Sequence, residues 1–500
     1  MTSPFPNSYW LEPGRILCGE YPRDFDDLED HEGMTAILQS GVRVFIDLTE
    51  EGELKPYREI ADKTVTDLGI DPADLEFFRY PIRDVSVPKN TQEMRAILRT
   101  IRMARHRQRT VYLHCWGGRG RTGTVAGCLL SDLFGLAGED ALVTLADRWL
   151  GCAKSEYSES PETDEQRGFV RSFSPVPPPI TSQVRAAILG AAVADALGVP
   201  VEFAGRARRK EDPVTDMRGY GTHHQPLGTW SDDTSMILAT VEALAENGDY
   251  SPGAIMEHFV GWLHEGRYTP HGKVFDVGGA TRSGIIKYQA ERNPATSGSD
   301  HESANGNGSL MRILPIALAY GDDPNLIQLA FEVSALTHSH IRSQFCCAFY
   351  CLVISELRHR SSLQEAVLFA HDVLTDQLDL PPKESEMLAR LHPDHLFARR
   401  EEEIHSSGHV INTLEAALWV NHQHDNYRDA VLHAVNLGDD TDTTASVAGG
   451  LASLLHGEEG IPQEWLEVLV KRESLIDLAE RFGDFCIKTA GDSLIRESRV

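Results

Sequence analysis

The sequence predicts a multidomain chain, with an α/β domain followed by a larger all-α domain. Its 500 residues are enough for two to four domains at about 100–200 residues each. Residues 174–182, SPVPPPITS, have the composition of an extended connector. Apolar patterning changes there, from short strand-like runs to long helical ones. We therefore expect domains at 1–173 and 183–500, joined by residues 174–182.

Before the connector, strand-like runs alternate with helical ones, as in a layered α/β domain. Enrichment in β-branched and aromatic residues predicts strands at 42–48, 76–82 and 110–114, and periodicity predicts a helix at 91–104. After it, helices are predicted at 184–197, 234–245, 252–263, 326–337, 342–358, 362–374 and 410–419. The polar segment 380–407 is expected to be a variable excursion.

Composition excludes several classes of function. The chain has 47 basic and 75 acidic residues, a net charge of −28, so phosphate-rich nucleic acid and acidic membranes are repelled. Its 8 cysteines include no CxxC pair, which argues against zinc ribbons and disulfide scaffolds and favours a reducing cytosol. The longest apolar run, about 345–354, is too short to span a membrane. We expect a cytoplasmic protein with no signal peptide.

Residues 111–124, VYLHCWGGRGRTGT, allow three interpretations. Gly118–Gly123 fit the G-x-G-x-x-G pattern of dinucleotide loops, but this motif is weak alone and leaves the cysteine unexplained. A Walker A loop fails because Gly-Lys-Ser/Thr is absent. The third interpretation uses every residue. Five residues separate Cys115 from Arg121, and such a loop, which contains Gly118 and Gly120, can wrap one tetrahedral oxyanion at a helix start.

In this phosphate cradle, Cys115 is a thiolate nucleophile and Arg121 binds two phosphate oxygens. The hydroxyl of Thr122 hydrogen-bonds the sulfur when it becomes the leaving group. The alternative is a buried cysteine followed by a packing loop. That alternative gives no reason for His, Cys, Gly, Arg and Thr at these spacings.

The H-C-x-x-G-x-x-R-T pattern resembles the signature of cysteine-dependent phosphatases, and residues 1–173 resemble the dual-specificity, protein-tyrosine-phosphatase-like group. The resemblance implies a phosphocysteine intermediate, no cofactor in this domain, and an aspartate that acts as general acid. Asp84, about thirty residues before Cys115, matches that acid's place; a solvated turn is the alternative. Gln166 vaguely resembles the family's water-positioning glutamine, and helix capping explains it at least as well.

Two carboxylate clusters stand out after the connector, in GTWSDDTSM and NLGDDTDTT. Their acids are Asp232 and Asp233 in the first string, and Asp439, Asp440 and Asp442 in the second. Oxygen ligands without His or Cys favour Mg²⁺, Mn²⁺ or Ca²⁺ over zinc or copper. Helix N-capping explains one aspartate per helix. It explains the crowded second string poorly, because like charges repel unless a cation intervenes.

About residues 183–490 resemble the ADP-ribosylglycohydrolase family, all-α hydrolases that remove ADP-ribose from modified proteins. The resemblance rests on WSDDT, GNGSLMR, THSH and GDDTDT, in this order. It implies two divalent cations, Mg²⁺ or Mn²⁺, that orient the distal ribose and polarise its anomeric linkage. The implied metal ligands are Ser231, Asp232, Asp233, Asp440, Asp442 and Thr443.

The same resemblance implies residues that bind substrate. Glu202 matches a mobile glutamate that can act as acid or base. Asn307, Gly308 and Ser309 would face the diphosphate, and His338 would approach the ribose, with a satisfied helical histidine as the alternative. Asp276 lies in a segment resembling the family's Asp-x-Gly-Asn-Thr, with Gly279 where asparagine is common, which puts one substrate hydrogen bond in doubt.

The resulting hypothesis is a bifunctional hydrolase that acts on ADP-ribosylated or phosphorylated protein, or on a nucleotide. Arginine-linked, serine-linked and free ADP-ribose derivatives stay open, as do inositol, lipid or RNA phosphates for the phosphatase half. Both activities could act on one target. The alternative is that one domain is catalytically silent and binds phosphate or ADP-ribose. The sequence does not indicate an oligomeric state.

Overall fold

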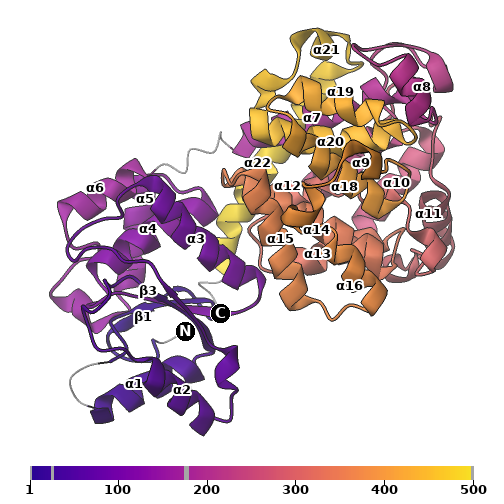
Figure 1. Cartoon of the computed structure of the whole chain (residues 1–500). Helices are drawn as coiled ribbons and strands as arrows, with labels where there is room; N and C mark the ends of the chain where they lie inside the picture. Colours follow the sequence, from indigo (N-terminus) through magenta and orange to yellow (C-terminus); the bar gives the residue numbers. More distant parts are fainter. Residues whose placement is uncertain (1–2, 24–26, 174–179, 497–500) are drawn as a thin grey trace. The chain divides into compact units, whose positions relative to one another are not determined.

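The computed structural model describes residues 3–23, 27–173 and 180–496. Contacts within the chain group into two compact units: unit 1, Met1–Val176 with Ala490–Val500, and unit 2, Pro177–Thr489. Figure 1 shows an α/β arrangement in the indigo and purple part of the chain and helices throughout the rest. The fold class predicted for each part is confirmed. Residues 174–179 of the predicted connector lie outside the described residues.

Unit 1 contains a five-stranded mixed sheet in the order β1-β2-β5-β3-β4. Only β1 and β2 pair antiparallel; the other neighbours are parallel. The strands are β1 Ser8–Glu12, β2 Ile16–Gly19, β3 Val42–Asp47, β4 Glu76–Arg79 and β5 Thr110–His114. The first two were not predicted, because they are short and buried throughout, so their side chains do not alternate between polar and apolar. The predicted strand at 76–82 ends earlier, at Arg79.

Helices cover both faces of the sheet (Figure 1). One face packs against α3 to α6, and the other against α1 and α2. The bounds are α1 Asp27–Gln39, α2 Arg58–Asp67, α3 Thr91–His106, α4 Gly120–Phe134, α5 Gly138–Trp149 and α6 Asp164–Ser172. Because β5 is the central strand, its carboxyl end opens in the middle of the sheet edge, where α/β proteins build ligand sites.

Unit 2 is helical, and each predicted helix is present with ends shifted by a few residues. Residues 380–407, predicted to be a variable excursion, contain the short helices α16 and α17. The bounds are α7 Ile180–Gly198, α8 Arg206–Glu211, α9 Asp232–Asn247, α10 Pro252–Glu265, α11 Gly279–Glu291, α12 Leu314–Tyr320, α13 Leu326–Ala335, α14 Ile341–Arg358, α15 Leu363–Gln377, α16 Pro382–Ala389, α17 Pro393–Leu396, α18 Val410–Gln423, α19 Tyr427–Asn436, α20 Thr441–His456, α21 Gln463–Val468 and α22 Arg472–Arg496.

Helices α7 and α20 pack against each other at backbone distance. A Cβ added at Gly449 would lie 2.5 Å from the Gly190 carbonyl oxygen, and one at Gly198 would lie 2.4 Å from the Asp442 nitrogen. Small residues therefore bring the carboxyl end of α7 directly against the amino end of α20. This contact places the second acidic string beside the residues that follow α7.

The same packing explains the apolar character of α7. The stretch Ile180–Val201 is 22 residues long and apolar enough to cross a membrane, but 89% of its most apolar window is buried inside the protein. This stretch is longer than the run at 345–354 that the sequence analysis singled out. Alanines and glycines make it apolar without bulk, and they serve the close contact with α20.

Candidate active sites

The loop after β5 has the form of a phosphate cradle. Cys115 is buried at the end of the strand. Gly118 has a φ of +69°, and a Cβ there would lie 2.4 Å from the Gly19 carbonyl carbon. At Gly120, the first residue of α4, a Cβ would lie 2.9 Å from Gln166 Nε2. Gly118 is thus required by its positive φ and its close approach to the backbone of β2, while Gly120 lets α4 begin against the side chain of Gln166 on α6.

A buried histidine supports this loop. Burial lowers the pKa of His114 to about 4, so the ring is neutral at pH 7. Its Nε2 lies 2.8 Å from the Tyr57 hydroxyl. The hydroxyl of Thr122 is buried and has no hydrogen-bond partner among the described residues, which leaves it free for the sulfur or a bound phosphate.

Glu53 binds Arg121 and was not predicted from the sequence. Arg121 Nη1 donates to Glu53 Oε2 at 2.8 Å and Nη2 donates to Glu53 Oε1 at 2.7 Å. Nη1 also donates to the Ile82 carbonyl at 3.0 Å, and Nη2 pairs with Asp84 Oδ1 at 2.9 Å. Burial by itself lowers the pKa of Arg121, but the hydrogen bond to Glu53 and the negative charges around the guanidinium together outweigh burial and raise that pKa. The same bond lowers the pKa of Glu53.

These four contacts have a chemical consequence. Glu53 and the Ile82 carbonyl accept three of the four Nη N–H bonds, and the Asp84 carboxylate forms an ion pair with Nη2. A phosphate that binds at Nη2 must therefore take the place of Glu53 or Asp84. The side chain of Asp84 is 50% exposed, whereas that of Glu53 is 17% exposed. Asp84 is therefore the acceptor that can leave, and leaving frees it to meet a departing oxygen.

A cavity of about 410 Å³ joins these residues. Its lining includes Asp84, Cys115, Gly120 and Arg121, all predicted from the sequence, together with Gln166. Gln166 also caps α6, because its Oε1 accepts from the Thr163 nitrogen at 3.1 Å while its Nε2 donates to the Ser86 carbonyl at 3.0 Å. The capping interpretation of Gln166 is confirmed, and the residue reaches the cavity as well.

In unit 2, the two acidic strings meet at the ends of α9 and α20. Thr443 Oγ1 donates to Asp233 Oδ2 at 3.2 Å across 210 sequence positions. Helix capping does not account for the acids. Ser231 is the N-cap of α9, and Asp195 on α7 accepts from the Ser231 and Thr234 nitrogens, both at 3.0 Å. Asp440 is the N-cap of α20, but its side chain makes no capping bond.

The carboxylates are crowded and incompletely paired. Burial, followed by the charges of neighbouring acids, raises the pKa of Asp232, Asp233 and Asp442 well above its usual value. Buried oxygens of Asp233 (Oδ1) and Asp440 (Oδ1) have no hydrogen-bond partner in the described chain. Buried charge of one sign needs a counter-charge, and a set of oxygen ligands fits a hard divalent cation.

Two groups in the described part of the chain could hold such an ion. One joins Glu202 with Asp440 and Asp442, and the other joins Glu202 with His223 and Asp276; within each group the ligand atoms lie within 4.8 Å of one another. Glu202 thus belongs to both groups.

His223 is the second residue that sequence reasoning missed, because it belongs to a polar loop without periodicity. Its Nε2 forms a hydrogen-bonded ion pair with Glu202. Burial raises the pKa of Glu202 to about 7, while the bond to Glu202 raises the pKa of His223. The pair therefore retains a proton at neutral pH.

The residues predicted to face substrate are divided between site and core. Asn307 Nδ2 donates to Asp440 Oδ2 at 2.9 Å. A Cβ at Gly308 would lie 2.9 Å from His338 Cε1, so this glycine and histidine are adjacent. Burial lowers the pKa of His338 to about 3, and its Nδ1 lies 2.8 Å from the Thr337 hydroxyl.

Ser309 is positioned differently. Its side chain is buried and its hydroxyl accepts from the Ser334 hydroxyl at 3.0 Å, which leaves the backbone of Ser309 as the part that can approach a ligand.

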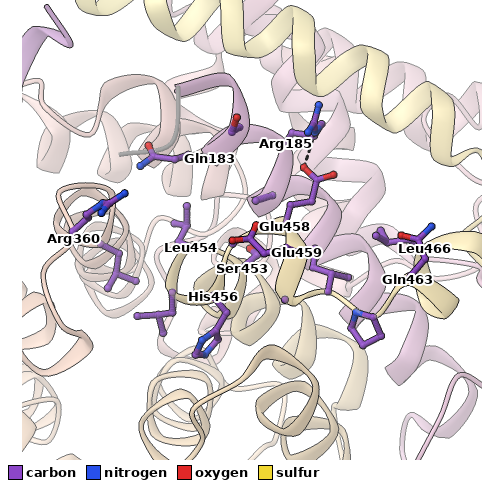
Figure 2. Close-up of a pocket in the computed structure, with 18 of the residues that line it drawn as sticks. Gln183, Arg185, Arg360, Ser453, Leu454, His456, Glu458, Glu459, Gln463 and Leu466 are labelled. Carbon is purple, nitrogen blue, oxygen red and sulfur yellow. Dashed lines mark hydrogen bonds and ion pairs between the residues drawn. The ribbon is translucent and has the colours of Figure 1, made fainter. Parts of the chain in front are cut away.

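Unit 2 has a separate cavity of about 990 Å³ between the ends of α7, α14 and α20. Figure 2 shows Arg185, Gln183, His456 and Glu458 around it. Arg185 Nε donates to Glu458 Oε2 at 2.6 Å, so the charge of this arginine is already compensated. None of the residues predicted for the metal or substrate site lines this cavity.

Comparisons with known proteins agree with this division. The model of the ADP-ribosylglycohydrolase family matches residues 177–491. That of the "Swiss Army Knife protein, DSP-PTPase phosphatase domain" matches residues 6–170.

Similar proteins match unit 2. ADP-ribosylarginine hydrolase Tri1 of Serratia proteamaculans (strain 568) is 32% identical over 303 residues, which cover 60% of this chain and 78% of that protein. ADP-ribosyl-[dinitrogen reductase] glycohydrolase of Rhodospirillum rubrum is 30% identical over 302 residues, 59% of this chain and 94% of that protein. A solved structure of an ADP-ribosylglycohydrolase-related protein complex is 30% identical, covers 62% of this chain and 99% of its own, and has a TM-score of 0.53.

The family model spans more than half of the chain, and the phosphatase model covers most of unit 1. The chain belongs to the ADP-ribosylglycohydrolase family and carries a DSP-PTPase phosphatase domain ahead of its glycohydrolase domain, and it is therefore a hydrolase of both types.

Proposed function

We propose that unit 2 removes ADP-ribose from arginine side chains of modified proteins with the help of two divalent cations, Mg²⁺ or Mn²⁺. The observation that carries the proposal is the junction of the two acidic strings through Thr443 and Asp233. On each side of this junction one carboxylate oxygen has no hydrogen-bond partner within the described chain. The arginine linkage is supported by the similarity to proteins named ADP-ribosylarginine hydrolases.

The chain's own residues divide the work in this site. Ser231, Asp232, Asp233, Asp440, Asp442 and Thr443 would hold the cations. When bound, the cations supply Lewis acidity toward the ribose oxygens. Hydrolysis adds the hydroxyl of water to the anomeric carbon, breaks its bond to the arginine nitrogen, and leaves a proton on that nitrogen.

Glu202 holds such a proton at neutral pH, because its pKa is raised to about 7, and it donates this proton to the departing nitrogen. Asn307 and the backbone around Gly308 bind the diphosphate, and neutral His338 contacts the ribose.

Unit 1 hydrolyses phosphomonoesters through a phosphocysteine. Cys115 Sγ attacks phosphorus while Arg121 binds the equatorial oxygens. Asp84, once it has separated from Arg121, takes up a proton from solvent and gives it to the leaving oxygen. Water then attacks the phosphocysteine and the sulfur leaves as a thiolate that accepts a hydrogen bond from Thr122. Gln166, which lines the same cavity, positions that water.

The test is release of ADP-ribose from arginine-modified and serine-modified proteins, with Mg²⁺ and with EDTA. We expect release from the arginine linkage alone, loss of activity in EDTA, and recovery with Mg²⁺ or Mn²⁺. Asp440→Asn should abolish release. Asp439→Asn is the matched control, because Asp439 is exposed and asparagine tolerates its φ of +57°. Release that persists in EDTA contradicts the metal assignment, and release from serine contradicts the linkage.

A further inference from the structure

Phe203 follows Glu202 directly and combines two unusual properties. Its backbone has a φ of +64°, a strained conformation for a residue with a bulky side chain. Its side chain is nevertheless 69% exposed, so burial of the ring does not compensate for the strain. Strain of this kind persists where surrounding bonds impose it, and it concentrates at functional sites.

Backbone hydrogen bonds to Asp439, in the second acidic string, impose this conformation. The Phe203 nitrogen donates to the Asp439 carbonyl at 2.7 Å, and the Asp439 nitrogen donates to the Ala204 carbonyl at 3.0 Å. The backbone of Phe203 is therefore tied to the residue that precedes Asp440. The ring is presented at a defined place beside the candidate acid rather than at the tip of an independent loop.

The surroundings of the ring are aromatic and acidic. The ring centroid of His223 lies 5.9 Å from that of Phe203 and 5.3 Å from that of Phe275. His223 is bonded to Glu202, and Asp276 belongs to the same group of ligand atoms. In the described chain, His223 is the one basic side chain that forms an ion pair with these carboxylates.

An aromatic face next to carboxylates is the chemistry that recognises a planar cation. Guanidinium stacks on aromatic rings and forms hydrogen bonds with carboxylates in its own plane. A serine linkage has neither a plane nor a charge for the ring to contact. The leaving arginine is bonded to the anomeric carbon through the nitrogen that Glu202 protonates. Phe203 follows Glu202 directly, so its ring belongs to the side of the site where the guanidinium departs.

We propose that Phe203 is a specificity-determining residue that stacks on the guanidinium of the ADP-ribosylated arginine. The inference rests on the proposed function of unit 2 and assigns the leaving-group side of that site. Stacking contributes to binding of substrate and transition state alike, so its loss raises KM and leaves kcat near the wild-type value.

The experiment compares Phe203→Leu with Phe203→Tyr. We expect Phe203→Leu to raise KM for ADP-ribosylarginine by about 3- to 30-fold, and to raise the inhibition constant of agmatine, a free guanidinium probe, by a similar factor. Phe203→Tyr should retain wild-type values. Inhibition by ADP-ribose should be unchanged in both variants, which also shows that the site remains folded.

Tyr220→Leu is the matched control. Tyr220 is also 66% exposed with a φ of +68°, but its ring makes no aromatic contact with His223 among the described residues. We expect agmatine inhibition to be unchanged in this variant. If wild type cleaves the arginine linkage and Phe203→Leu keeps the wild-type KM and agmatine constant, the inference is wrong while the proposed function stands. If wild type does not cleave that linkage, the proposed function itself is wrong.

Discussion

The two sites differ in how their buried charges are balanced. In unit 1, Arg121 is already paired with Glu53 and Asp84, so the phosphate-binding cation is compensated within the fold. In unit 2, carboxylates from α9 and α20 meet, while one buried oxygen each of Asp233 and Asp440 has no hydrogen-bond partner among the residues that the structure describes. Unpaired buried charge is costly. The first site therefore carries its own counter-ions, one of which we expect substrate to replace, whereas for the second we propose that cations come from solution.

The largest expected effect is the loss of one activity while the other is unchanged. Cys115→Ser removes the nucleophile and should lower phosphatase kcat by about 10³-fold or more, with ADP-ribose release unchanged. Asp440→Asn should do the reverse. Both activities are measured on each variant of the full chain, with p-nitrophenyl phosphate for unit 1. If either variant lost both activities, the two sites would not be independent.

Acid should destabilise unit 1 through His114. Its folded pKa is about 4 against about 6.5 unfolded. Above pH 6.5 the ring of His114 is neutral in the folded and the unfolded state, so its protonation does not change the free energy of unfolding. As pH falls from 6.5 to 4, the unfolded state gains the proton first and about 3 kcal/mol of stability is lost.

His114→Asn should show no such loss. The free energy of unfolding from urea titrations, followed by hydrogen exchange of peptides from β5 and α4, is compared at pH 7 and pH 4.5. At pH 7, His114 is neutral in the folded and the unfolded state. The difference in unfolding free energy between wild type and variant at this pH therefore serves as the reference. An equal loss in wild type and variant would contradict the role of this histidine.

Metal should stabilise unit 2 alone. At 100 times its dissociation constant, Mg²⁺ or Mn²⁺ should add about 2.7 kcal/mol to the free energy of unfolding. The thermal transition of unit 2 should rise accordingly, and Asp440→Asn should lose this response while Asp439→Asn retains it. Peptides of unit 1 followed by hydrogen exchange should not respond. A metal response in unit 1 would break the contrast between the sites.

The smallest expected effect tests whether Glu53 positions Arg121. Glu53→Gln leaves Arg121 with Asp84 as its charged partner, and the arginine is then less well positioned. We expect kcat/KM for p-nitrophenyl phosphate to fall by about tenfold, the worth of one charge-assisted hydrogen bond. Glu51→Gln, at an exposed position nearby, is the control and should have wild-type activity. No change in Glu53→Gln would show that the loop alone positions Arg121.

The chemistry of both sites could be predicted where it depends on residues close in sequence. Cys115 and Arg121 lie in one loop, and each acidic string lies at one helix start, so spacing alone indicates the ligand. The presence of the predicted helices followed from periodicity for the same reason, although their ends differ by a few residues. Ser309 shows the limit of this approach, because its motif predicts a ligand contact while the turn at Asn307–Ser309 directs its hydroxyl toward Ser334.

The sequence by itself determined the two fold classes, the cysteine cradle and the composition of the acidic strings, because these depend on local spacing and side-chain chemistry. Only the tertiary structure decided which distant groups complete each site. Glu53 reaches Arg121 because β3 and β5 are parallel neighbours, and Asp442 comes beside the end of α7 because glycines let α7 and α20 touch. Contacts between residues far apart in the chain depend on strand order and helix packing, and no local pattern records them.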